Sequence, residues 1–159
     1  MMDWQLIISI LLTLAPVIEL RGGLPVAIHY AISKGLPTFP IFFIIVILNI
    51  LIIFPIFFFL DVIHHRLTRF KWYDKSANFF IERTQKKVDK VEKRMGLLGY
   101  FALALFVAVP LPGTGAYTGS LVSWILGLER KRAIPAIALG VAIAGLIIYA
   151  ASLGLFKLI

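Results

Sequence analysis

The chain has 159 residues, of which 60% are hydrophobic and 15% are charged, and its mean hydropathy is +0.95. This composition is too apolar for a soluble domain and predicts an integral membrane protein with one domain, residues 1–159. A net charge of +8 would suggest a nucleic-acid partner for a soluble protein, but here most of the charge lies in one polar segment, so membrane topology explains it. The absence of cysteine excludes disulfides and thiolate metal sites.

The first 34 residues are apolar on both sides of a short segment rich in helix breakers. Residues 4–18 and 22–33 carry no formal charge. The whole stretch is too long for one membrane crossing and too short for two, which need roughly 40 residues. We therefore expect residues 1–34 to form a re-entrant hairpin with a non-helical tip. The residues expected to form this tip are Pro16, Gly22, Gly23 and Pro25.

Residues 35–60 follow as an uninterrupted apolar run, long enough at ~1.5 Å per residue to cross a hydrocarbon core of ~30 Å. The next segment, residues 61–95, contains ten Lys or Arg residues and five Asp or Glu residues, and the positive-inside rule places it in the cytoplasm. Apolar residues recur from Ile81 to Met95 at heptad spacing, which predicts an amphipathic helix lying on the membrane or on the bundle. A homodimer contact through this helix is the alternative.

The second half repeats this order. Residues 96–128 have the length and central breakers of another re-entrant hairpin, residues 129–132 add three cytoplasmic cations, and residues 133–156 form the second predicted span. Both termini then lie outside. The sequence thus predicts an all-α, multi-pass protein built as an inverted repeat of hairpin and span, a design found in transporters.

Two charges lie at the centre of the first hairpin. Glu19 and Arg21 are flanked by long apolar runs, and charged groups at membrane depth are functional candidates because they are costly to bury. They could neutralise each other, or Arg21 could bind an anion while Glu19 exchanges a proton; a purely structural ion pair is the alternative. Asn49, inside the first span, is equally consistent with an interhelical hydrogen bond and with a substrate contact.

The second tip, residues 110–120, is free of charge but suited to anions. A helix that begins there would direct free N–H groups and the positive end of its dipole at the bundle centre, as would a helix that begins after Gly22 and Gly23. Close helix packing is the alternative role for the glycines. The second tip contributes the candidate binding residues Gly113, Thr114, Gly115, Tyr117 and Thr118, and also the hydroxyl of Ser120. No hydrolytic triad, histidine cluster or carboxylate pair is present, so we expect neither enzymatic activity nor a cofactor or metal.

Two motifs, Ala15 to Pro25 and Pro110 to Gly119, resemble the family of small multidrug export proteins. That family is similar at a distance to the DedA and VTT-domain membrane proteins, whose fold has two opposed re-entrant hairpins with acidic and basic residues. Some of those proteins move lipid phosphates or phospholipids. The resemblance therefore implies a transporter with Glu19 and Arg21 at a charged tip, although the arginine usual in the second hairpin of the distant relatives has no counterpart here.

The leading hypothesis from the sequence is translocation of an anionic lipid headgroup, with Arg21 and the two helix N-termini as anion ligands and Glu19 coupling transport to protons. Membrane lipids and protons are then the expected partners. Export of cationic drugs, with Glu19 as counter-ion, is the alternative. A membrane scaffold that does not transport is the third hypothesis.

Overall fold

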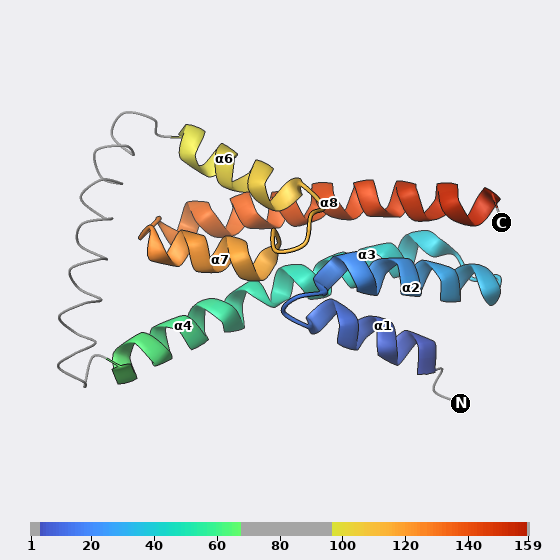
Figure 1. Ribbon diagram of the computed structural model, residues 1–159, viewed down its shortest axis with the longest axis horizontal. Coiled ribbons are helices and arrows are strands. Elements are labelled where there is room, and N and C mark those ends of the chain that lie inside the picture. Colours follow the sequence, from blue (N-terminus) through green and yellow to red (C-terminus); the bar gives the residue numbers. More distant parts are fainter. Residues whose placement is uncertain (1–3, 68–96, 159) are drawn as a thin grey trace.

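The computed structural model describes residues 4–67 and 97–158, and all the regular elements in these two ranges are helices. Figure 1 shows their arrangement. The predicted amphipathic helix from Ile81 to Met95, and any dimer contact through it, lie outside the described residues. In chain order the helices are α1 (Trp4–Leu14), α2 (Glu19–Ser33), α3 (Thr38–Leu51), α4 (Ile53–Leu67), α6 (Leu97–Ala108), α7 (Ala116–Ile125) and α8 (Arg130–Leu158).

Two continuous helical segments are long and apolar enough to cross a membrane, and we call them rods. They are Thr38–Ile63 and Arg130–Leu155, each of 26 residues. The sequence-based expectation of two such helices is confirmed. The first rod comprises α3 and α4 with a single turn residue, Ile52, between them. Pro55 explains the interruption, because proline has no N–H for the carbonyl four residues earlier. Helical hydrogen bonding nevertheless continues from Ile56 N–H to the Ile52 carbonyl, at 3.2 Å.

The other helices form two pairs that fold back on themselves. Helices α1 and α2 are joined by residues 15–18, and α6 and α7 are joined by residues 109–115; from here on, the first tip and the second tip are these two segments. The second tip is shorter than the expected residues 110–120, because residues 116–120 lie in α7. In Figure 1 the two pairs approach from opposite ends of the molecule, and both tips lie near its middle. The N- and C-terminal ends of the described chain lie at the same end of the molecule.

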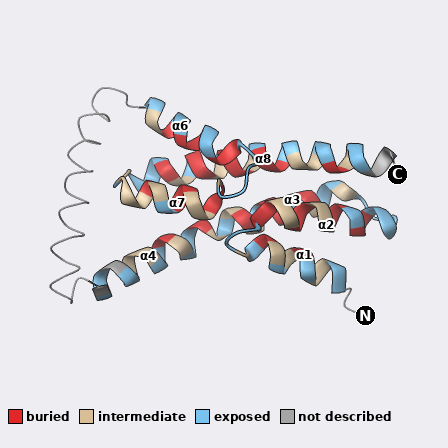
Figure 2. Cartoon of the chain, in the orientation of Figure 1, coloured by how far each residue is buried: buried red, intermediate tan, exposed pale blue. Residues whose placement is uncertain are grey.

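Helix α2 lies in the interior of the fold, where it contacts α1, α3 and α8. Its side chains Leu24, Ala27 and Ile28 are fully buried. Figure 2 shows buried residues concentrated around the middle of the molecule and exposed residues on the outer faces. Those outer faces are apolar: Phe58, for example, is 70% exposed. An apolar exterior of this kind suits contact with lipid rather than with water.

Small residues permit the close approach of α6 and α8. A Cβ atom added at Gly140 would lie 2.6 Å from both the Ala104 carbonyl oxygen and the Val107 Cβ atom, and neither can move independently of its backbone. We expect Gly140→Ala to destabilise the fold by about 1–3 kcal/mol, as overpacking does elsewhere. Gly154→Ala, in the same helix with nothing within 4 Å, is the matched control. Equal thermal unfolding of the two variants in detergent would contradict this account of α6–α8 packing.

Candidate functional site

The first tip is shorter than the sequence suggested. Helix α2 begins at Glu19, so Arg21, Gly22, Gly23 and Pro25 all lie inside the helix. The expectation that the glycines and Pro25 form a non-helical tip, with the helix starting after Gly23, is wrong. The connection is residues 15–18, where Pro16 is the only breaker.

The two glycines in α2 serve packing instead. A Cβ at Gly23 would overlap the Thr13 hydroxyl and lie 2.6 Å from the Ser9 carbonyl oxygen, both on α1. A Cβ at Gly22 would overlap the side chain of Ile18. Glycine at these positions therefore allows α1 and the first tip to fold tightly against α2. This is the packing role that the sequence left open as an alternative.

Glu19 occupies a left-handed backbone conformation with φ of 49°. Such a conformation is uncommon for a residue other than glycine and costs about 1 kcal/mol or more. Glu19 is only 4% exposed, so its side chain points into the molecule rather than toward the outside. This strained backbone occurs at the residue whose carboxylate contacts the opposite helix pair, next to the second tip.

The Glu19 carboxylate caps α7. It accepts hydrogen bonds from the N–H of Ala116, at 3.2 Å, and from the N–H of Tyr117, at 3.0 Å. Helix α7 begins at Ala116, immediately after Gly115, and a Cβ at Gly115 would overlap this carboxylate. The free N–H groups and the positive dipole end expected at the second tip thus exist, but in this structure they bind the protein's own anion.

Arg21 also binds the second tip. Its guanidinium donates to the carbonyl of Thr114 and to the Thr114 hydroxyl at 2.6 Å, and it approaches the Val109 carbonyl at 3.3 Å. Val109 directly follows α6, so the cation lies at the negative end of that helix. Glu19 and Arg21 therefore bond to the opposite helix pair and not to each other.

Side chains from the rest of the bundle cap α1 in turn. The Tyr117 hydroxyl donates to the Leu14 carbonyl at 2.7 Å, and the Asn49 amide donates to the Thr13 carbonyl at 3.2 Å. Carbonyls at a helix end have no partner within the helix and are costly to leave unpaired in an apolar environment. Asn49 thus has the interhelical role that its sequence position allowed. We call the set Glu19, Arg21, Thr114, Gly115 and Tyr117 the tip junction.

A small cavity of about 10 Å³ adjoins the tip junction, and its lining includes Glu19, Arg21, Asn49 and Gly115. The Nε atom of Arg21 and the Oδ1 atom of Asn49 are buried, and neither has a hydrogen-bond partner in the described structure. One is a donor and the other an acceptor, and a space of this size accommodates a single water molecule. The cavity is therefore a mostly apolar space with a few polar groups, including the buried Glu19 carboxylate, in its lining.

Three remaining candidates lie away from the tip junction contacts. Gly113 has φ of +83°, which only glycine adopts readily, so its role is to turn the second tip. Thr118 lines a groove between α4 and α7. Ser120 is fully buried within α7, and its hydroxyl has no partner among the described residues.

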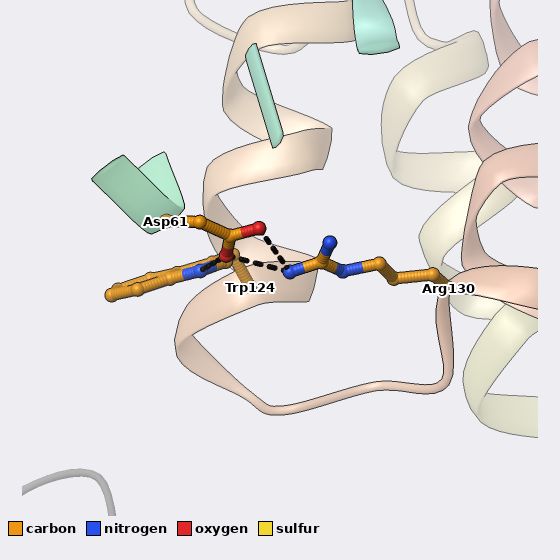
Figure 3. A network of polar contacts seen from close by, with 3 residues as sticks. All are labelled: Asp61, Trp124 and Arg130. Atoms are coloured by element: carbon orange, nitrogen blue, oxygen red, sulfur yellow. Dashed lines mark hydrogen bonds and ion pairs between the residues drawn. The ribbon is translucent and has the colours of Figure 1, made fainter. Parts of the chain in front are cut away.

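A second polar cluster, which the sequence did not single out, joins α4, α7 and α8 (Figure 3). Asp61 accepts hydrogen bonds from the Trp124 indole at 3.1 Å and from Arg130 at 2.6 and 2.8 Å. The Arg130 guanidinium also lies 5.4 Å from the Phe57 ring centroid. Their positions in the sequence could have identified them: Asp61 is the first charged residue after the predicted span 35–60, and Arg130 lies just before the predicted span 133–156.

We expect this cluster to contribute little stability. The side chains of Arg130 and Asp61 are 51% and 42% exposed, and ion pairs of this kind contribute about 0–1 kcal/mol. Arg130→Gln should therefore lower the thermal unfolding midpoint only slightly, and by less at high salt because salt screens the pair. Unfolding curves in detergent at low and high salt test this. A large, salt-independent loss would contradict it.

Comparison with known proteins bears on what this arrangement does. A family model described as "Putative small multi-drug export protein" matches residues 19–147. The chain belongs to this family. The match begins at Glu19, contains every residue of the tip junction and the first long apolar helix, and ends inside the second, Arg130–Leu155. A search of curated proteins and a search of solved structures each found no match.

Membership of the small multidrug export family, together with two helices of spanning length, makes the chain a membrane protein of an export class. The tip junction supplies the chemistry. It holds one carboxylate and one guanidinium in a largely apolar interior. A cationic ligand could replace the N–H donors that bind the carboxylate, and an anionic ligand could replace the oxygen acceptors that bind the guanidinium. Such a site has the chemical groups to bind a charged group or a proton.

Proposed function

We propose that the chain exports small amphipathic molecules across the membrane, with the tip junction as the point that binds the charged group. The observation that carries this proposal is the Glu19 carboxylate, which is 4% exposed and bonded to the start of α7 in a protein of the small multidrug export family. A buried carboxylate at membrane depth attracts a cation or a proton. This favours export of cationic drugs over the lipid hypothesis from the sequence.

The mechanism follows from the capping contacts. A cationic group that pairs with Glu19, or a proton that binds it, weakens the two hydrogen bonds from Ala116 and Tyr117, because these bonds are strongest to an ionised acceptor. The start of α7 is then free to leave α2. Binding at Glu19 would thus favour separation of the two tips, and release of the ligand would favour the closed state described here.

The membrane arrangement that suits this mechanism is an inverted repeat. Both helix pairs are re-entrant, the first from outside and the second from the cytoplasm, and each is followed by a spanning rod. The order of two short helices and one long rod occurs twice, which supports this assignment. Residues 61–95 and 129–132 would then be cytoplasmic and both termini external, in accord with the distribution of cations. Accessibility labelling of cysteines placed at Lys34 and Lys131 should report opposite sides of the membrane; labelling from the same side would refute the repeat.

Translocation of an anionic lipid or a lipid-linked phosphate is the second candidate. It is favoured by the convergence of Arg21 and the start of α7 at one point, where an anionic headgroup could replace the Glu19 carboxylate. A headgroup would have to displace Glu19 to bind, whereas a cation would only have to pair with it. For this reason we place drug export first.

Reconstitution into liposomes distinguishes these functions. We expect efflux of a cationic dye that depends on a pH gradient, with no movement of a fluorescent phosphate lipid. Movement of the lipid alone would reverse the ranking of the two candidates. Movement of neither compound would support a scaffold without transport activity. Empty liposomes and liposomes that contain the Gly115→Ala variant are the controls.

A further inference from the structure

An open groove lies between α4 and α7, next to the tip junction. Its volume is about 560 Å³, within the ~300–1,000 Å³ typical of sites for drug-sized ligands. Its side chains are mostly apolar, and several are accessible: Phe59 is 63% exposed and Leu121 is 41% exposed. The groove is lined by Ile52, Pro55, Ile56, Phe59, Leu60, Tyr117, Thr118 and Leu121.

The groove offers hydrogen-bond acceptors and aromatic rings. Pro55 has no N–H, so the carbonyl of Leu51 lacks its usual helical donor on the face of the rod that carries Pro55. Thr118 also lines the groove, and its hydroxyl can accept a hydrogen bond as well as donate one. Phe59 and Tyr117 are among the lining residues, and the faces of such aromatic rings are electron-rich and attract cations. An aromatic or amphipathic cation fits this lining better than an anion.

Tyr117 connects the groove to the tip junction. Its ring lines the groove, its N–H binds the Glu19 carboxylate at 3.0 Å, and its hydroxyl binds the Leu14 carbonyl at 2.7 Å. A ligand that displaces the ring therefore acts on a residue that bonds to both helices of the first pair. Occupancy of the groove and release of Glu19 are linked through this one residue, whose side chain bonds to α1 and whose backbone N–H bonds to Glu19.

We propose that the α4–α7 groove binds the apolar body of an organic cation and that Tyr117 transmits its occupancy to Glu19. This inference rests on the proposed export function, which it extends by assigning a place and a chemical class to the ligand. The groove holds the apolar part of the ligand, and the charged part pairs with Glu19 once Tyr117 has moved. A lipid acyl chain is the competing occupant.

The test is the binding of ethidium, a planar aromatic cation, to the purified full-length protein in detergent, followed by fluorescence polarisation. Leu121→Trp fills the groove and should weaken binding by at least about tenfold. Thr118→Val removes an acceptor with little change in shape and should weaken it less. Leu139→Trp is the matched control, because Leu139 is 53% exposed on α8 and does not line the groove.

Several outcomes would overturn the assignment. Equal affinity in Leu121→Trp, Thr118→Val and the Leu139→Trp control would show that the dye binds elsewhere. Displacement of ethidium by an anionic or neutral lipid, but not by a second aromatic cation, would identify an acyl-chain site only. Thr118→Val keeps the test decisive if Leu121→Trp does not fold.

Transport in liposomes separates this inference from the proposed function. If wild-type protein exports ethidium while the groove variants bind and export it normally, the groove assignment fails and the export function stands. If the groove variants lose binding but wild-type liposomes export no dye, the groove stands as a binding site and the export function fails.

Discussion

Gly115→Ala should expel the Glu19 carboxylate from the start of α7 and abolish export. The backbone at Gly115 is extended, with φ of −151° and ψ of −158°, so alanine can adopt it without strain. The obstacle is steric, because all three of the nearest heavy atoms to an added Cβ belong to the Glu19 carboxyl group. Loss of two hydrogen bonds to an ionised acceptor, together with the overlap, should destabilise the protein by at least about 3 kcal/mol.

A double-mutant cycle makes this prediction specific. Because the three heavy atoms nearest to an added Cβ all belong to Glu19, Gly115→Ala should cost less in a Glu19→Ala background. Thermal unfolding in detergent gives the four stabilities. Gly99→Ala on α6, with nothing within 4 Å, controls for the substitution itself. Additive effects of Gly115→Ala and Glu19→Ala would show that Glu19 does not lie against the second tip.

The rods and the second tip were accessible to sequence reasoning, because each depends on local composition. An unbroken apolar run predicts a spanning helix wherever it packs, and Gly113 to Gly115 interrupt the chain where α7 begins. Local composition gives the wrong prediction inside α2, where glycine and proline lie within a continuous helix. Gly22 and Gly23 were interpreted as breakers, although their function is to let α1 approach, and Pro25 is accommodated within the helix.

The chemistry of the tip junction was only half predictable. An acidic and a basic residue in an apolar run can be recognised as candidates from the sequence, and so can hydroxyl residues beside glycines. Their hydrogen-bond partners cannot be recognised in this way, because Glu19 bonds to Tyr117 and Arg21 bonds to Thr114, each separated by more than half of the chain. No local pattern encodes which helix end a side chain will reach. The Asp61, Trp124 and Arg130 cluster was missed for the same reason.

Removing both charges of the tip junction should cost less stability than the sum of removing each one. Glu19 and Arg21 attract each other electrostatically although they share no hydrogen bond. Arg21→Gln leaves the buried Glu19 charge without this attraction, and removing one partner of a buried pair elsewhere costs ~3–5 kcal/mol. Glu19→Gln should cost less electrostatically, because Arg21 is only partly buried. Glu19→Gln also leaves one of the N–H groups of Ala116 and Tyr117 without an acceptor. Adding Arg21→Gln restores neutrality, so we expect the double variant to be more stable than the summed effects predict.

Export should not recover together with stability in the Glu19→Gln, Arg21→Gln variant. This difference distinguishes a carboxylate that acts in transport from one that is only structural. If Glu19 only holds the two tips together, then transport per folded molecule will follow stability and return in the Glu19→Gln, Arg21→Gln variant. If Glu19 is the group that exchanges cation and proton, both Glu19→Gln and the double variant will stay inactive while folding recovers. Dye efflux normalised to folded protein, measured beside unfolding midpoints, separates these cases. Retained transport in the double variant would exclude Glu19 and Arg21 from the transport mechanism.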